Sequence, residues 1–208
     1  MRFDRAVWSS MPGIERAGYW MACVFDRARR FCAALDAADV PYAICGGMSV
    51  MAWVSSRNPD FVRTTKDVDV CMRRSDLARA AEAVRDAGFV LVEVNGVPMF
   101  LDGPDGTPKT AVHVVVAGEP TSRFDREPVP DIGSPVRDEH SEWNRIGILE
   151  LLTMKLLAMR PHDVAHVADM LRVGLIDESW RRLVPASLAD RFDRALQEYR
   201  DHYEDSAH

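Results

Sequence analysis

The sequence predicts an α/β fold in which a small mixed, twisted sheet is flanked by helices and followed by a helical C-terminal part. Three observations support this prediction. Short apolar or alternating runs, typical of strands, recur between residues 42 and 118 and are separated by helical or turn-forming segments. The dipeptide Asn95-Gly96 between two of these runs is a strong hairpin signal. Beyond residue 145 the remaining patterns are those of helices.

The first half of the chain is expected to alternate between helix and strand. Residues 14–38 carry apolar side chains near the 3.6-residue period and predict a helix that Pro41 ends. The elements that follow are a short buried strand ending in a double-glycine turn at 42–47, a short helix at 48–54, a polar loop at 55–66 and a strand at 67–72.

The next segment, residues 75–88, predicts an amphipathic helix with Ser75 as its N-cap and Gly88 as its C-cap. The remaining expected elements are strands at 89–94, 97–103 and 109–118, a loop with four prolines at 118–143, a helix at 148–160 that Pro161 bends or restarts, and closing helices at 177–184 and 187–205. The chain thus divides into an N-terminal tail (1–13), an α/β core (14–118), a proline-rich loop (119–145) and a helical region packed on the core (146–208).

Composition limits the classes of function. The 208 residues include 26 lysines and arginines against 32 acidic residues, a formal charge of -6, which argues against coating a nucleic-acid backbone. The composition is still compatible with a small site for a polyanionic ligand. The chain has no apolar run long enough to span a bilayer and no apolar signal core near its start, so we expect a cytoplasmic protein without a membrane partner. Four cysteines without a CxxC pair are expected to be reduced, mostly buried thiols.

Two aspartates mark the strand at 67–72. Asp67 and Asp69 are two positions apart and therefore share one face of the strand, with their carboxylates roughly 6 to 7 Å apart. At an effective dielectric near 20 they repel by about 2.5 kcal/mol. A bound divalent cation is one reason for such a pair. A solvent-facing strand end, with Lys66, Arg73 and Arg74 as counterions, is the other.

Two polar segments near the aspartates suit a phosphate ligand. Gly46 and Gly47 end a strand just before a helix, where missing side chains and free N–H groups admit a phosphate, and Ser49 adds a hydroxyl. A tight turn explains the glycines equally well. Arg63 and Lys66 can neutralise phosphate oxygens and Thr65 can orient Asp67, unless the segment is simply a polar loop tip. Arg63, Thr65 and Lys66 are therefore nucleotide-binding candidates.

These motifs together resemble a known family. Residues 34–54 and 63–72 resemble the start of the polymerase-beta-type nucleotidyltransferase superfamily, whose pattern is a Gly-Gly/Ser turn, a helix, and an Asp–hydrophobic–Asp strand. Residues 151–171 resemble the helical motif of the branch that includes AbiEii-type toxins. The resemblance implies a nucleotidyltransferase-type sheet with Gly46, Gly47 and Ser49 at the triphosphate, Asp67 and Asp69 at magnesium, and Lys155 and Asp163 as the lysine and first aspartate of the helical motif.

The implied activity is transfer of a nucleoside monophosphate from an NTP, such as ATP, with Mg²⁺ or Mn²⁺ as the cofactor. The acceptors that the resemblance allows are an RNA end, a protein side chain or a small hydroxylated molecule. It also implies a toxin-like or defence enzyme with an antitoxin partner. Two interpretations of Lys155 are open. Its ammonium either snorkels along the flank of the helix or points into a cleft beside an anion.

The sequence departs from the family pattern at the position of the third carboxylate, where it has His113. A neutral imidazole can bind a metal or take a proton, so His113 is also a metal-ligand candidate. Asp102 is a candidate for the missing acid, and His166 stands where the helical motif repeats an aspartate.

The competing hypothesis is a degenerate scaffold that binds a nucleotide or a partner protein without turnover. A metal-dependent hydrolase is a weaker third reading. Whether His113 faces Asp67 and Asp69 distinguishes the first two.

Overall fold

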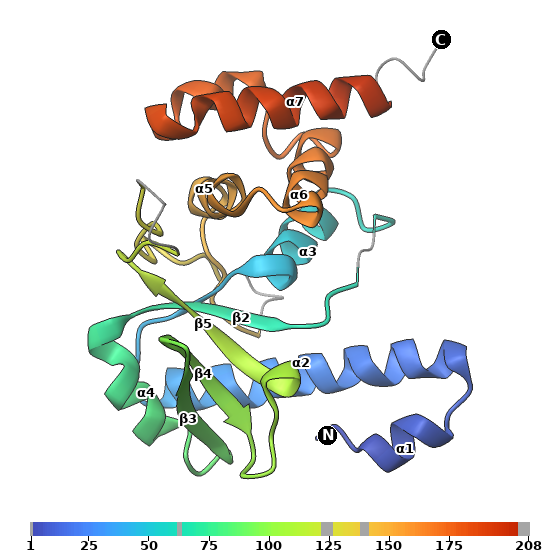
Figure 1. Ribbon diagram of the computed structural model, residues 1–208, viewed down its shortest axis with the longest axis vertical. Coiled ribbons are helices and arrows are strands. Elements are labelled where there is room, and N and C mark those ends of the chain that lie inside the picture. Colours follow the sequence, from blue (N-terminus) through green and yellow to red (C-terminus); the bar gives the residue numbers. More distant parts are fainter. Residues whose placement is uncertain (1, 62–63, 122–126, 138–141, 204–208) are drawn as a thin grey trace.

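A five-stranded mixed sheet forms the centre of the computed structural model, which describes residues 2–61, 64–121, 127–137 and 142–203 (Figure 1). The strand order is β1-β2-β5-β4-β3. Strands β2 and β5 are parallel, and the other neighbouring pairs are antiparallel. The strands are β1 (Ala43–Ile44), β2 (Val68–Arg73), β3 (Phe89–Val94), β4 (Val97–Asp102) and β5 (Ala111–Ala117).

Helices cover both faces of this sheet. In Figure 1, α2 and α4 lie on one side, while α3, α5 and α6 lie on the other, with α7 outermost. The α-helices are α1 (Arg5–Ser10), α2 (Gly13–Ala37), α3 (Gly46–Arg57), α4 (Leu77–Ala83), α5 (Ile148–Ala158), α6 (Pro161–Arg172) and α7 (Ala189–Tyr203). Short 3₁₀ turns occur at η1 (Arg74–Asp76), η2 (Pro108–Thr110), η3 (Glu178–Arg182) and η4 (Ala186–Leu188).

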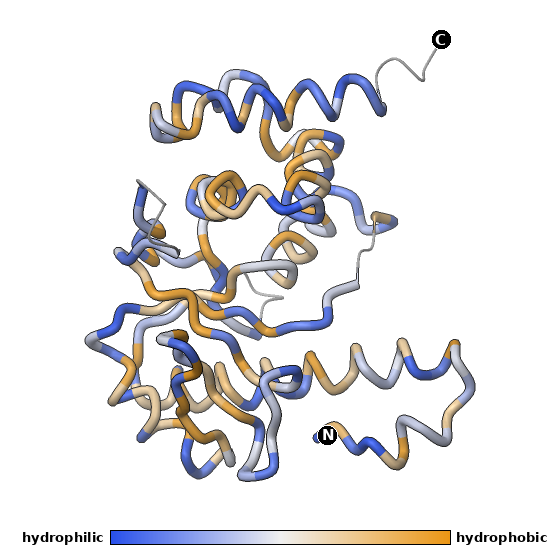
Figure 2. The backbone as a smooth tube through the Cα atoms, viewed as in Figure 1, coloured by the Kyte–Doolittle hydropathy of each residue, from blue (hydrophilic) through white to orange (hydrophobic). Residues whose placement is uncertain are grey.

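The alternation of the central strands creates two separate cores. Along β2, Val68, Val70 and Met72 are fully buried against α2 and α4. Cys71 points to the opposite face, where it joins the core formed by α3, α5, α6 and α7. In Figure 2, apolar segments line the interior, whereas the outer helix α7 is largely hydrophilic. Asp69 shares the face of Cys71, so the period of two directs it toward the C-terminal helices, and Asp67 immediately precedes the first residue of β2.

Most of the predicted elements are confirmed. The α/β class, the hairpin at Asn95-Gly96 and the helical C-terminal part are all present. Pro161 does not bend one helix but starts a second, because Met159 has a positive φ of 47° and ends α5. All four cysteines are free and buried, as expected. Among the described helices, none is both long and apolar enough to cross a bilayer.

Three local expectations are corrected. The glycine pair does not precede the helix but forms the first turn of α3, which begins at Gly46. Residues 178–182 form a 3₁₀ turn rather than an α-helix. The segment expected to be a tail contains α1, whose N-terminus is capped by Asp4 through its Oδ1 atom, which accepts hydrogen bonds from the N–H groups of Ala6 and Val7.

Candidate active site

The two aspartates and His113 lie together at the N-terminal ends of the two central strands. Asp69 and His113 are direct partners in the parallel pairing of β2 with β5, and both side chains are half-buried. The His113 Nδ1 atom is 3.7 Å from Asp69 Oδ1. The His113 Nε2 atom is 2.9 Å from the carbonyl oxygen of Pro108. Since a carbonyl can only accept, Nε2 carries the proton and Nδ1 is the nitrogen that faces the acid pair.

The glycine pair packs directly against these acids. Gly46 has a φ of +60°, and a Cβ atom placed on it would collide with the carboxylate of Asp69. A Cβ on Gly47 would lie 2.9 Å from the hydroxyl oxygen of Thr65 and 3.9 Å from Cε1 of His166 on α6. The first turn of a helix leaves N–H groups without intrahelical acceptors. In α3 these include the N–H groups of Gly47 and Met48, so a polarised helix end stands beside two carboxylates.

The loop before β2 positions Asp67 through the backbone. The Thr65 hydroxyl donates a hydrogen bond to the carbonyl oxygen of Asp67 at 3.2 Å, so Thr65 orients the main chain of this aspartate. Lys66 is exposed, and its carbonyl accepts a hydrogen bond from the indole of Trp20 at 3.1 Å. Arg63 lies outside the described residues.

The electrostatics of the acid pair favour a bound cation. Burial, and then the charge of Asp69, raise the pKa of Asp67 above its usual value. The neighbouring carboxylate of Asp69 likewise raises the pKa of His113. Neither aspartate forms an ion pair with a described lysine or arginine, so the repulsion within the pair is not relieved by a fixed cationic side chain.

The donor set suits a hard divalent cation. Carboxylate oxygens are the preferred ligands of Mg²⁺, which is usually held by one or two carboxylates and completed by substrate phosphates and water. Within the described part of the chain, no three His, Cys, Asp or Glu side chains are already gathered closely enough to hold a metal. Asp67 and Asp69 therefore fit a cation that arrives with a phosphate ligand rather than a fully preassembled protein cage.

Lys155 and Asp163 form a buried ion pair next to this site. Lys155 Nζ is 3.0 Å from Asp163 Oδ1, and the two side chains are 5% and 0% exposed. Arg160 Nε lies 2.7 Å from Asp163 Oδ2. Burial would raise the pKa of Asp163, but the hydrogen bond from Arg160 and the charge of Lys155 outweigh it and hold that pKa below its usual value. Lys155 therefore neither snorkels nor opens into a cleft, because it joins α5 to the first turn of α6.

Two further candidate residues, Ser49 and Asp102, are not placed to bind a ligand. Ser49 is completely buried, so the structure does not place it where a bound triphosphate can reach. Asp102 was a candidate for the missing third acid, but it is held by three arginines. Its Oδ2 lies 2.8 Å from Arg30 and 3.5 Å from Arg27, and its Oδ1 lies 3.3 Å from Arg2. These contacts bind the N-terminal segment to the end of β4, and they leave His113 in the third position of the site.

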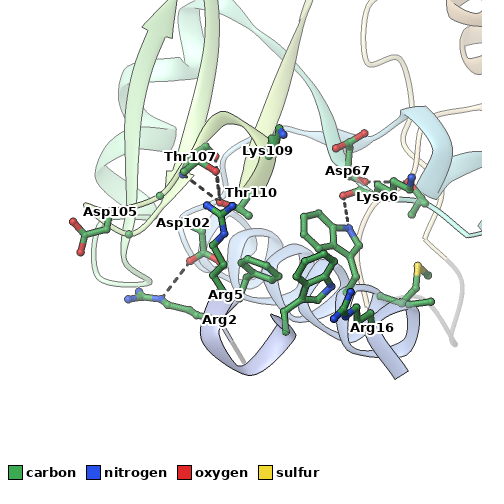
Figure 3. Close-up of a pocket in the computed structure, with 18 of the residues that line it drawn as sticks. Arg2, Arg5, Arg16, Lys66, Asp67, Asp102, Asp105, Thr107, Lys109 and Thr110 are labelled. Carbon is green, nitrogen blue, oxygen red and sulfur yellow. Dashed lines mark hydrogen bonds and ion pairs between the residues drawn. The ribbon is translucent and has the colours of Figure 1, made fainter. Parts of the chain in front are cut away.

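Sequence reasoning missed a cavity of about 980 Å³ that borders Asp67 (Figure 3). It is lined by the N-terminal segment, the start of α2, the loop before β2 and the turn after β4. No sequence signal identified it, because the N-terminal residues were expected to form a tail. Its aromatic and basic side chains are Phe3, Trp8, Trp20, Arg2, Arg5, Arg16, Lys66 and Lys109.

No protein-family model and no curated protein matches this sequence. Among solved structures, the chain is similar to an antigenic nucleotidyltransferase-like protein from Paracoccidioides brasiliensis, with a TM-score of 0.45 and 15% identity over 91% of this chain and 90% of that one. It is also similar to ANT(2")-Ia in complex with adenylyl-2"-tobramycin, with a TM-score of 0.42 and 12% identity over 83% of this chain and 96% of that one.

Proposed function

We propose that this chain is a metal-dependent nucleotidyltransferase that moves a nucleoside monophosphate from an NTP to an acceptor hydroxyl. One observation carries the proposal: Gly46, the first residue of α3, packs against Asp69 with no side chain between them. A helix N-terminus favours phosphate, and a carboxylate pair favours a divalent cation. Their direct contact is the arrangement that a metal-bound triphosphate requires.

The chemistry is a displacement at the α-phosphorus. The acceptor hydroxyl oxygen forms a new bond to the α-phosphorus, and the bond from that phosphorus to the bridging oxygen of the β-phosphate breaks. Pyrophosphate leaves with the bonding electron pair. When bound, a divalent cation supplies positive charge at the phosphates and stabilises the attacking and leaving oxygens. We assign the hydroxyl proton to Nδ1 of His113, since Nε2 already donates to Pro108.

The remaining residues have positioning roles in this proposal. The N–H groups of Gly47 and Met48 hold phosphate oxygens, and the exposed Lys66 adds charge near them. Asp67 and Asp69 hold the metal. Lys155 and Asp163 fix α6 over the glycine turn, because their ion pair fastens the helix end whose His166 lies against Gly47.

A direct labelling experiment tests this function. The purified chain is incubated with each α-³²P-labelled NTP, Mg²⁺ or Mn²⁺, and a pool of RNA, protein and small-molecule acceptors. The expected result is metal-dependent label on one acceptor class together with release of pyrophosphate. Asp69→Asn should remove both signals, whereas Asp86→Asn, which changes an exposed acid in the turn after α4, should keep them.

The second candidate is a scaffold that binds nucleotides without turnover, and the backbone contact of His113 with Pro108 is the observation that favours it. In that case calorimetry would detect binding of the metal-bound NTP while no acceptor becomes labelled and no pyrophosphate is released. The toxin role and an antitoxin partner stay predictions of the sequence.

A further inference from the structure

The cavity beside Asp67 has an aromatic wall. The Phe3 ring lies 5.0 Å from the Trp20 ring in an edge-on arrangement and 6.3 Å from the Trp8 ring. All three rings are partly exposed, and all three line the cavity. The indole N–H of Trp20 is bonded to the carbonyl of Lys66, so the wall is tied to the loop that carries Asp67 (Figure 3). An open cavity with exposed indole rings suits a planar ligand that stacks.

The same cavity carries a surplus of positive charge, in a chain whose net charge is -6. Five basic and three acidic side chains line it. One of the acids, Asp102, is already neutralised by arginines. Four of the five basic side chains, Arg5, Arg16, Lys66 and Lys109, form no ion pair with a described residue, and those of Arg5 and Lys109 form no hydrogen bond with one either. Figure 3 shows Arg5 extending from α1 toward the turn that carries Thr107 and Thr110. These charges are available to an anionic ligand.

The position of the cavity assigns it to the acceptor. Asp67 lines the cavity and also belongs to the acid pair that contacts the glycine turn of α3. The glycine turn and α6 lie on the Cys71 face of the sheet, whereas the cavity is built from α1, the start of α2 and the turn after β4. A triphosphate at the glycine turn and a second ligand in the cavity would therefore meet at Asp67.

We propose that this cavity binds the acceptor, and that the acceptor is a nucleoside phosphate, either free or at the end of an RNA strand. This inference rests on the proposed nucleotidyl transfer. A nucleoside phosphate combines the three groups that the site requires: a planar base for the rings, a phosphate for Arg5 and Lys109, and a ribose hydroxyl for the reaction at Asp67. A volume of about 980 Å³ accommodates one nucleotide with space to spare.

Tryptophan fluorescence and calorimetry test the inference without relying on turnover. The probes are AMP and UMP, adenosine, inorganic phosphate, a five-nucleotide RNA with a free 3′ end, and tobramycin as a polycation. AMP or UMP, or the RNA, should quench tryptophan emission in a saturable way, and their binding should weaken with added salt. Adenosine, which lacks the phosphate, should bind at least about tenfold more weakly. Tobramycin and inorganic phosphate should not quench. Stronger binding of the RNA than of the free nucleotides identifies the strand end as the source.

Variants localise the bound probe. Trp8→Leu should weaken binding by about 5- to 100-fold, since a stacked base is lost. The matched control is Tyr203→Leu, an exposed ring on α7, which should change nothing. Arg5→Gln with Lys109→Gln should weaken nucleotide binding but not adenosine binding, whereas Arg194→Gln on α7 should have no effect. Circular dichroism of each variant verifies that the fold is kept.

Competition with the NTP separates failure of this inference from failure of the proposed function. Saturating ATP with Mg²⁺ should leave the AMP-induced quench intact, and Asp69→Asn should retain it. Displacement of AMP by ATP would overturn the inference, because the cavity would then hold the NTP. Absence of nucleotide binding in a chain that still transfers label would overturn the inference alone. Nucleotide binding in a chain that transfers nothing would instead remove the proposed function.

Discussion

Two acidic sites on the same side of the sheet hold their carboxylates in opposite ways. Asp67 and Asp69 lie half-buried or exposed at the start of β2, and no described lysine or arginine pairs with them. Asp163 is fully buried and bound by both Lys155 and Arg160. The pKa of Asp67 is accordingly raised by burial and by its acidic neighbour, while the pKa of Asp163 is lowered by its basic ones.

The contrast separates two uses of charge. An ion pair that is completed within the protein contributes to the fold, because each buried charge already has its partner. A carboxylate pair that no described lysine or arginine neutralises keeps most of its repulsion until a cation arrives, and this is typical of functional sites. We therefore expect Asp67 and Asp69 to act in binding and Asp163 to act in stability.

The largest expected effect is on activity. The double variant Asp67→Asn/Asp69→Asn should lose at least about a thousandfold in nucleotidyl transfer, because the charges that hold the metal and stabilise the transition state disappear. Its free energy of unfolding in metal-free buffer should be equal or higher, since a repulsive pair is relieved. Activity assays and urea unfolding measure the two quantities. A marked loss of stability without metal would instead give these aspartates a structural role.

At the buried pair the expected effect is on stability. Lys155→Met removes the ammonium and leaves Asp163 with Arg160 alone, so the free energy of unfolding should fall by about 3–5 kcal/mol. At 5% exposure, the Lys155 side chain is too deeply buried for solvent to replace its interaction with Asp163. Arg181→Met, which breaks the exposed pair with Asp193, is the matched control and should cost less than about 1 kcal/mol. Equal losses in the two variants would contradict the comparison.

The third effect concerns His113. His113→Ala should lower the rate by about 10²- to 10⁴-fold if Nδ1 takes the hydroxyl proton. The affinity for Mn²⁺, measured by electron paramagnetic resonance, should stay within about twofold, since the two carboxylates remain. A large fall in Mn²⁺ affinity would make His113 a metal ligand. An unchanged rate would remove it from the chemistry altogether.

Sequence patterns predicted those parts of the fold and of the site that depend on local spacing. The alternating run at 67–72 predicted β2, which begins at Val68, and the Asn95-Gly96 pair predicted the hairpin. The sequence left open whether His113 faces Asp67 and Asp69. Their meeting depends on the parallel pairing of β2 with β5, which the structure shows.

Features that depend on distant contacts could not be predicted in this way. Asp102 was a candidate ligand because the sequence does not show that Arg2, Arg27 and Arg30 reach it from the N-terminal segment and α2. The aromatic cavity was missed for the same reason. Phe3 lies next to Trp20 only because α1 folds back along α2, and a short segment of mixed polarity carries no periodic signal for such a contact.

The smallest expected effect is on the pH dependence of stability. The folded-state pKa of Asp163 lies below its unfolded value, so its ion pairs stabilise the protein fully above the unfolded pKa of about 3.9. That contribution is lost as the pH falls from there through the lowered folded-state pKa. Urea unfolding of wild type and Asp163→Asn at steps between about pH 6 and pH 2.5 measures it, since the difference between the two curves removes the titration of all other acids. The difference should be constant above about pH 5 and shrink below about pH 4.

The exposed Asp193, whose pKa is also lowered, is the control, and Asp193→Asn should give a smaller pH-dependent difference because solvent screens its pair with Arg181. A difference for Asp163→Asn that does not change with pH would mean that the variant acts through packing, and the contrast between the two acidic sites would then lose its electrostatic basis.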